Sequence, residues 1–280
     1  MEKLYKRRAQ KALPILVRQA KSKHPIFYKN LADELGMPNP RNLDYVLGDI
    51  GRTLSALSEG KNWSLDIPQI QALVINQKTG MPGHGFDGFL KSRGYHKLSL
   101  LQKRQYLPGY WNEIFAYPYW TEVLGKLGLP PVKLGLQHLI ERAKTGRGAG
   151  GGEGEEHRKL KEFVAAHPAT LGLPSSAPEG QTERPLPSGD RIDVLFVSRK
   201  MVLGVEVKSH ISNDVDIVRG LFQCVKYQAV LAASASVEND FREIEVALVV
   251  GRKMPVELIA LQNSLGIKVV EITDLRKVRR

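Results

Sequence analysis

Two acidic residues and a lysine in the second half of the chain have the types and the spacing of a hydrolytic site. Asp193 precedes Glu206 by thirteen residues, and Lys208 follows Glu206 by two. Because side chains alternate along a strand, Glu206 and Lys208 would share one face, while the neighbouring valines point to the other. Asp193 and Glu206 can bind a hard cation such as Mg²⁺ or Mn²⁺ through oxygen. Lys208 could orient or help deprotonate the attacking water, or offset charge on a phosphate, so the pattern indicates a metal-dependent phosphodiesterase.

A solvated ion pair at a strand edge is the alternative interpretation of Glu206 and Lys208, and such a pair contributes little to stability. The rest of the segment is apolar, with Val202, Leu203, Val205 and Val207. An apolar strand of this kind is typical of the centre of a sheet, where charged groups are costly unless they have a function. We therefore favour the catalytic interpretation.

The spacing of Asp193, Glu206 and Lys208 resembles the signature of the PD-(D/E)XK nuclease superfamily. In that family a proline often precedes the first acidic residue, whereas Ile192 stands there in this chain. This departure leaves a choice between Asp190 and Asp193 for the first position. Asp190 lies in a Pro-Ser-Gly turn, where a turn-forming hydrogen bond is its ordinary role, so we favour Asp193.

The resemblance also implies a preceding helix that carries an acidic residue, and residues 154–164 fit one. At about 100° per residue, Glu156 falls on the apolar stripe of this helix, whereas Glu155 falls outside it. The stripe consists of Leu160, Phe163, Val164 and His167. We therefore expect Glu156 to join Asp193 and Glu206 as a catalytic and metal-binding carboxylate.

A helix is expected after the Lys208 strand, over residues 216–232. Arg219, Gln223 and Tyr227 recur in it at intervals of four and share one face. Gln223 and Tyr227 resemble an element that borders the active site in several branches of the superfamily, which implies catalytic-site roles for both and a nucleic-acid contact for Arg219. A separate apolar stripe should pack on the sheet, with Ile217, Leu221, Cys224 and Val225.

The second half of the chain alternates between helical and strand patterns. We predict helices over 155–166, 216–232 and 255–264, and strands over 182–186, 191–197, 202–209, 245–250 and 268–272. Early neighbouring strands followed by a crossover helix give an α/β fold, an α/β/α mixed sheet of the restriction-endonuclease-like type. Residues 155–280 form this domain, and the glycine-rich segment 146–154 is expected to be a flexible linker.

Residues 1–145 are expected to form a mainly helical domain with an aromatic-rich extension. Short helices over 27–36 and 43–57 enclose a turn, and a strand over 71–76 leads into the glycine-rich loop 78–86. This order resembles a winged-helix domain. Nucleic-acid contacts are expected at Arg41, Asn42, Arg52, Lys61 and Lys78. The aromatic rings of residues 106–120 could stack on bases, but burial in a core is the interpretation that we favour.

The charge distribution points to a polyanionic partner. The net charge is +12, and the first 145 residues hold 22 Lys and Arg against 11 Asp and Glu, while the remainder hold 19 against 18. Such an excess favours phosphate contacts and counterion release. We therefore expect a Mg²⁺-dependent DNA nuclease, an endonuclease of prokaryotic restriction, defence or repair as the resemblance implies. RNA is an alternative substrate, because a fold does not fix the substrate, and a non-catalytic DNA-binding or regulatory protein is the alternative function.

Membrane insertion and disulfide bonding are not expected. No apolar run approaches the roughly 18 to 20 residues needed to span a bilayer, and the N-terminal segment lacks a signal-peptide pattern. The single cysteine, Cys224, leaves no intramolecular disulfide and suits a reducing compartment. The sequence therefore predicts a cytoplasmic protein without membrane contact, and it allows a homodimer.

Overall fold

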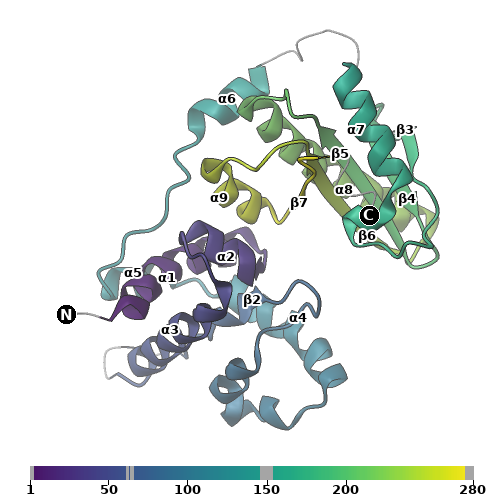
Figure 1. The fold of residues 1–280 in the computed structure, drawn as a ribbon. Coiled ribbons are helices and arrows are strands. Elements are labelled where there is room, and N and C mark those ends of the chain that lie inside the picture. Colours follow the sequence, from purple (N-terminus) through teal and green to yellow (C-terminus); the bar gives the residue numbers. More distant parts are fainter. Residues whose placement is uncertain (1–2, 61–62, 64–65, 146–153, 275–280) are drawn as a thin grey trace. The chain divides into compact units, whose positions relative to one another are not determined.

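The computed structural model of the protein describes residues 3–60, 63, 66–145 and 154–274. The chain forms two compact units, Met1–Lys133 and Leu134–Arg280, each with its own core (Figure 1). The predicted α/β class is confirmed, because the second unit contains a five-stranded mixed sheet. The most glycine-rich part of the predicted linker, 146–153, lies outside the described residues. None of the described helices is long and apolar enough to cross a membrane.

Helices dominate the first unit. Its longer elements are α1 (Leu4–Ser22), α2 (Tyr28–Glu34), α3 (Leu43–Ser58), α4 (Leu100–Ala116) and α5 (Trp120–Lys126). Its shorter elements are β1 (Ile26–Phe27), η1 (Pro40–Asn42), η2 (Ile70–Leu73), β2 (Val74–Ile75), η3 (His84–Arg93) and η4 (Tyr95–Lys97). The predicted amphipathic helix is α3, which buries Leu43, Val46, Leu47, Ile50 and Leu54.

The region predicted as a wing has a different form. A winged helix would continue from β2 into an antiparallel hairpin, whereas among the described residues of this unit β2 pairs only with β1, in parallel. After β2 the chain closes into a turn in which the Asn76 amide donates to the Met81 carbonyl at 2.8 Å. Gly80 supplies a positive φ of 67° in this turn.

The aromatic segment of residues 106–120 is part of the core, as the favoured interpretation predicted. Tyr110 and Trp120 are buried. The indole nitrogen of Trp111 donates to the Ala72 carbonyl at 2.9 Å, and that of Trp120 donates to the Ile114 carbonyl at 2.8 Å. These bonds satisfy the polar ends of rings whose apolar bodies fill the core.

The second unit is a sheet covered by helices on both faces. Its strands are β3 (Gln181–Pro185), β4 (Arg191–Val197), β5 (Met201–Lys208), β6 (Glu243–Val250) and β7 (Lys268–Glu271), in that spatial order. Its helices are α6 (Gln137–Thr145), α7 (Glu155–Ala166), η5 (Pro168–Leu171), α8 (Asp214–Glu238) and α9 (Val256–Leu265). The first three strands are antiparallel neighbours and the last three are parallel neighbours.

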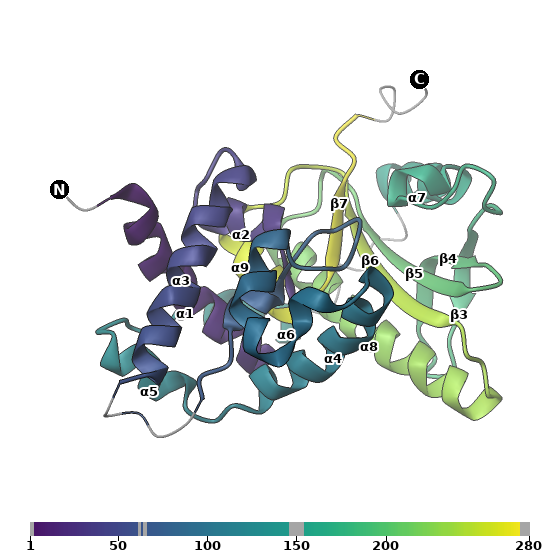
Figure 2. The same cartoon turned by 90° about the horizontal axis from the view of Figure 1, so that it is seen from below.

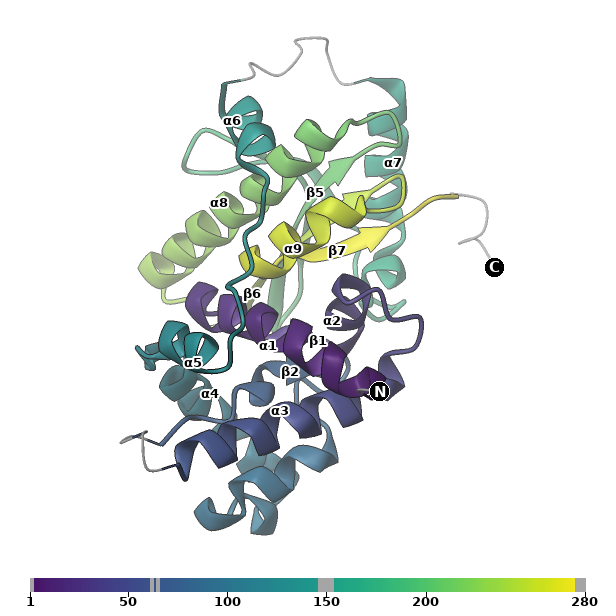
Figure 3. The same cartoon turned by 90° about the vertical axis from the view of Figure 1, so that its left-hand side faces the viewer.

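Two apolar layers pack on the two faces of this sheet. One layer joins α7 and η5 to the sheet, and the other joins α6, α8 and α9 to the opposite face. Figures 2 and 3 show α7 on one side of the sheet and α8 and α9 on the other. Val205 and Val207 belong to the α7 layer, so the alternation along β5 turns Glu206 and Lys208 toward α8.

Two details of the helices differ from the sequence predictions. The residues of α6 were expected in the N-terminal domain, but Leu139 and Ile140 of this helix, with Leu136 just before it, pack in the same apolar layer as α8, and the compact units divide after Lys133. On α8, Val225 was expected to pack on the sheet, but its side chain is exposed. The other members of that stripe, Ile217, Leu221 and Cys224, are buried as predicted.

Candidate active site

Strand β5 presents Glu206 and Lys208 at its C-terminal end. The strand is central, with β4 on one side and β6 on the other, and Glu206 is only 3% exposed. The ammonium of Lys208 donates to Glu206 Oε1 at 2.6 Å and to the amide oxygen of Gln223 at 3.2 Å. A buried carboxylate is therefore held against a lysine that α8 also contacts.

Asp193 reaches this pair because β4 and β5 part at its position. Their pairing runs from Val197–Val202 to Val194–Val205 and does not extend to Asp193. One carboxylate oxygen of Asp193 accepts from the Val207 amide at 2.7 Å, and the other lies 3.4 Å from His157 Nε2. The carboxylate is thus fixed between the end of β5 and helix α7.

The pKa values of Glu206 and Lys208 are both shifted, by burial and by the neighbouring charges. Burial raises the pKa of Glu206 to about 7, and the nearby charge of Asp193 adds to this rise, while Lys208 opposes it. Burial acts to lower the pKa of Lys208, but attraction to Glu206 and other carboxylates outweighs it, so the pKa is raised. Lys208 therefore stays charged at neutral pH. Glu206 can exist in either protonation state.

Helix α8 contributes the wall opposite the sheet. Gln223 contacts Lys208, and Tyr227 is buried behind it, where the hydroxyl donates to the Arg191 carbonyl at 2.9 Å. Burial raises the pKa of Tyr227, so its hydroxyl keeps its proton. Arg219 Nε donates to the Ala143 carbonyl of α6 at 3.2 Å. Gln223 and Tyr227 are therefore directed at β5 and β4, whereas Arg219 contacts α6.

A glycine lets α8 approach the strand this closely. A Cβ atom at Gly220 would lie 2.8 Å from Leu248 Cδ1 and 3.1 Å from Lys208 Cε. Any larger residue would push the helix or the lysine away. Cys224 is buried in the same helix, and burial raises the pKa of its thiol, so the thiolate form is disfavoured.

Helix α7 directs His157 at the site, whereas the sequence favoured Glu156. The Glu156 side chain is 42% exposed, 3.2 Å from Lys159 and 3.8 Å from His210. His157 lies one turn before Lys161, which is only 3% exposed and pairs with Glu183 of β3. The predicted stripe residues Leu160, Phe163 and Val164 are buried, but the buried face also extends to Lys161, which the pattern of apolar residues did not predict.

Asp190 lies in the turn between β3 and β4, as its sequence context predicted. Its carboxylate accepts from the Ser188 hydroxyl at 2.7 Å and pairs with Lys226 at 2.7 Å. The turn closes through the Leu186 amide, which donates to the Asp190 carbonyl at 2.8 Å. Asp190 is thus tied to the turn and to α8.

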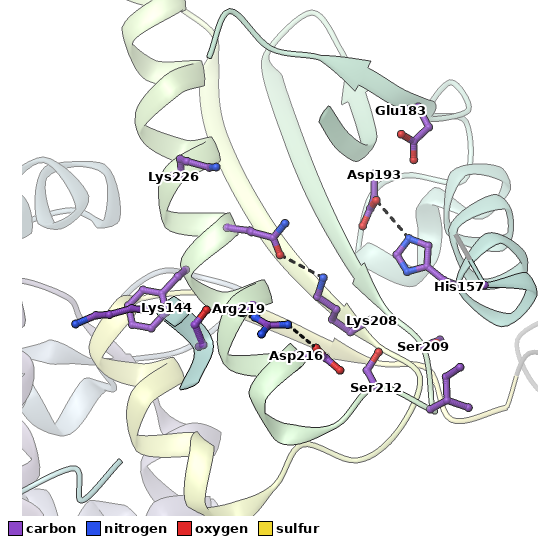
Figure 4. Close-up of a pocket in the computed structure, with 15 residues that line it drawn as sticks. Lys144, His157, Glu183, Asp193, Lys208, Ser209, Ser212, Asp216, Arg219 and Lys226 are labelled. Carbon is purple, nitrogen blue, oxygen red and sulfur yellow. Dashed lines mark hydrogen bonds and ion pairs between the residues drawn. The ribbon is translucent and has the colours of Figure 1, made fainter. Parts of the chain in front are cut away.

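A cavity of about 910 Å³ opens over these groups, and its two walls differ in charge (Figure 4). The cations Lys144, Arg219 and Lys226 come from α6 and α8. The opposite wall carries Glu183, Asp193 and His157, while Asp216 of α8 lies beside Arg219 on the cationic wall. An anionic ligand could therefore approach along the cationic wall while its reacting group faces the carboxylates.

The donor set suits a hard divalent cation bound by few protein groups. Within the described part of the chain, no three or more His, Cys, Asp or Glu side chains are grouped to hold a metal ion. Mg²⁺, however, is usually held by one or two carboxylates together with water and substrate phosphates. Asp193 and Glu206 both reach the C-terminal end of β5, where Asp193 accepts from the Val207 amide and Glu206 pairs with Lys208. These two carboxylates are the ones that could hold such an ion, whereas Glu156 pairs with Lys159.

The nucleic-acid contacts predicted in the first unit lie on its surface where they are described. Arg41, Asn42 and Lys78 are exposed, and exposed Arg52 is 3.4 Å from Asp49. Lys61 lies outside the described residues. Comparison with known proteins found no match: no family model, curated protein or solved structure is similar to this chain at a significant level.

Proposed function

We propose that the second unit is the catalytic domain of a Mg²⁺- or Mn²⁺-dependent nuclease that hydrolyses phosphodiester bonds in DNA. The observation that carries the proposal is the position of Asp193 and Lys208 in one cavity, with the lysine held between Gln223 and the buried Glu206. Charged groups on a central strand are costly to bury, so their retention there favours a chemical function. The resemblance of their spacing to PD-(D/E)XK nucleases supports the same conclusion.

Each residue has a distinct role in this proposal. Asp193 and Glu206 would hold the cation, which when bound would offset the charge that develops on the phosphoryl group. The Lys208 ammonium has three donors, of which Glu206 and Gln223 engage two, and the third can orient a water molecule or a phosphate oxygen. Gln223 fixes the direction of that ammonium. Tyr227 supports this arrangement from the buried side through its bond to the backbone of β4.

The cationic wall gives the substrate its orientation. Lys144, Arg219 and Lys226 make ion pairs with nearby carboxylates, and the pairs of Lys144 and Lys226 are largely exposed. Exposed ion pairs are weak, so Lys144 and Lys226 can turn to a phosphate at little cost, while Arg219 is fixed by its bonds to Asp216 and the Ala143 carbonyl. We infer that the three cations bind the backbone on either side of the reacting group, and that the basic first unit supplies the remaining affinity for DNA.

The test is cleavage by the full chain. Supercoiled plasmid, linear duplex, single-stranded DNA and RNA are each incubated with Mg²⁺, Mn²⁺ or a chelator. We expect metal-dependent cleavage of DNA that Asp193→Asn and Glu206→Gln abolish. Glu243→Gln is the matched control, because Glu243 is exposed at the opposite end of the parallel β5–β6 pair from Lys208.

Three outcomes would change the proposal. Cleavage that persists in both Asp193→Asn and Glu206→Gln would refute the assigned site. DNA binding without cleavage under any metal condition would favour the non-catalytic DNA-binding alternative. Cleavage of RNA alone would keep the chemistry and replace the substrate.

A further inference from the structure

The wall of the cavity formed by α8 is not purely cationic. Phe222 lines the cavity and is 36% exposed, and Ile211 lines it from the loop after β5. Single exposed apolar side chains are common on protein surfaces and need no special explanation. Phe222 differs because it lies between two cations, Arg219 and Lys226, that line the same cavity.

The three side chains form one face of the helix. Phe222 follows Arg219 by three residues and precedes Lys226 by four, which are the spacings of neighbours on a helical surface. Seven residues correspond to about 10 Å along the helix axis, so the cations flank the ring on either side. Proteins that bind single-stranded nucleic acid combine a cationic groove with aromatic rings on which bases stack. The same combination is present at this wall.

Stacking on Phe222 requires a base that has left its duplex. In a double helix both faces of a base are covered by its neighbours, and only its edges are open in the grooves. We propose that the cavity binds an unpaired nucleotide, whose base stacks on Phe222 while Arg219 and Lys226 hold the adjacent phosphates. The proposal rests on the nuclease function proposed above, and it names single-stranded DNA, or a single-stranded segment of a longer DNA, as the substrate class.

Substitutions at two neighbouring positions of α8 test the proposal in the full chain. Phe222→Ala removes the ring from the cavity, and Phe222→Trp keeps an aromatic face. Val225→Ala is the matched control, because Val225 is 37% exposed on the same helix but does not line the cavity. The ligands are a DNA single strand, the blunt duplex of the same sequence, and the single strand with abasic sites.

Binding is measured by fluorescence anisotropy in a chelator, so that no ligand is cleaved. Because Phe222 is partly covered, we expect a stacking free energy at the low end of the usual range. Phe222→Ala should therefore lose about 5- to 10-fold in affinity for the single strand. Affinity for the duplex and for the abasic strand should change less than about twofold, because neither ligand offers an unpaired base that could stack on Phe222. Phe222→Trp should bind the single strand like the wild type, and Val225→Ala should bind all three ligands unchanged.

Single-turnover cleavage with Mg²⁺ supplies the second measurement. The preference for single-stranded over duplex DNA should fall in Phe222→Ala by the same factor as the affinity. An equal loss for single strand, duplex and abasic strand, or no loss, would overturn the stacking proposal, and cleavage by the same protein would leave the nuclease function intact. Selective loss of single-strand affinity in a protein that cleaves nothing would instead refute the nuclease function and retain the binding site.

Discussion

Glu206→Gln is expected to stabilise the metal-free protein at high pH, although it removes a proposed catalytic group. Burial raises the pKa of Glu206 from an ordinary 4.5 to about 7, so the folded state binds this proton more tightly than the unfolded state. The resulting stabilisation is complete below about pH 4.5 and is lost as the pH rises through 7. At about 1.4 kcal/mol for each tenfold difference in proton affinity, the loss amounts to about 3 kcal/mol.

The neutral amide of the Glu206→Gln variant would resemble the protonated acid at every pH, so the difference in stability from wild type should grow with pH. We expect the variant to be more stable by less than about 1 kcal/mol at pH 5 and by up to about 3 kcal/mol at pH 8. The attraction of Lys208 is already part of the Glu206 pKa, so it limits this gain without reversing it. The stability of many enzymes rises in the same way when strained catalytic groups are replaced.

Urea denaturation in a chelator at pH 5, 6, 7 and 8 measures this difference. Far-ultraviolet circular dichroism is the suitable signal, because the tryptophans Trp63, Trp111 and Trp120 all lie in the first unit and their fluorescence would not report on β5. Glu243→Gln is the control, with an effect that should not vary with pH. A Glu206→Gln variant that is less stable than wild type at pH 8, or a difference that is constant from pH 5 to 8, would refute the reasoning.

Three further predictions concern neighbouring residues. Leu221→Ala, at a fully buried position, should cost roughly 2 to 5 kcal/mol of unfolding free energy, whereas Gln223→Ala should slow single-turnover cleavage and change stability by less than about 1 kcal/mol; equal stability losses would make Gln223 structural. Mg²⁺ should raise the urea midpoint of the wild type but not of Asp193→Asn, since only the folded site binds the ion; the same rise in both would place the ion elsewhere. Gly220→Ala should lower stability by roughly 1 to 3 kcal/mol through overpacking against Leu248. An unchanged urea midpoint would mean that α8 shifts to accommodate the added methyl group without loss of stability.

Local sequence patterns were sufficient for the elements of the second unit. Strand β4 was predicted over the residues it occupies, because a short segment that ends in four consecutive apolar residues lies there between two turns. Helix α8 was predicted too short at both ends. It begins at a capping box in which Asn213 accepts from the Asp216 amide at 3.0 Å, and it ends at Asn239 with a φ of 53°. Both signals are local, but neither interrupts the apolar pattern that was used to set the bounds.

Tertiary contacts determine which face α7 buries and which unit α6 joins, and the pattern of apolar residues in the sequence does not contain this information. The face that α7 buries includes Lys161, whose charge is satisfied by Glu183 of a distant strand, and this pairing turns His157 rather than Glu156 toward Asp193. A periodicity that counts only apolar residues cannot include a buried lysine, and the 100° between neighbouring residues is enough to exchange the two side chains. In the same way, α6 joins the second unit through apolar contacts with α8 that no local signal at residues 134–140 distinguishes from contacts within the first unit.

The site itself depends on two irregularities that a regular pattern hides. Strands β4 and β5 stop pairing before Asp193, and Glu183 in the neighbouring strand has a positive φ of 56°, so the carboxylate of Asp193 leaves the plain alternation of its strand. Gly220 lets α8 lie close enough for Gln223 to contact Lys208. The residue types of the proposed site were selected from the sequence by their chemistry and spacing. The side chains converge because the backbone departs from regular geometry at two places, the end of the β4–β5 pairing and Gly220. A substitution that removes either departure should therefore reduce activity, although no proposed catalytic residue is changed.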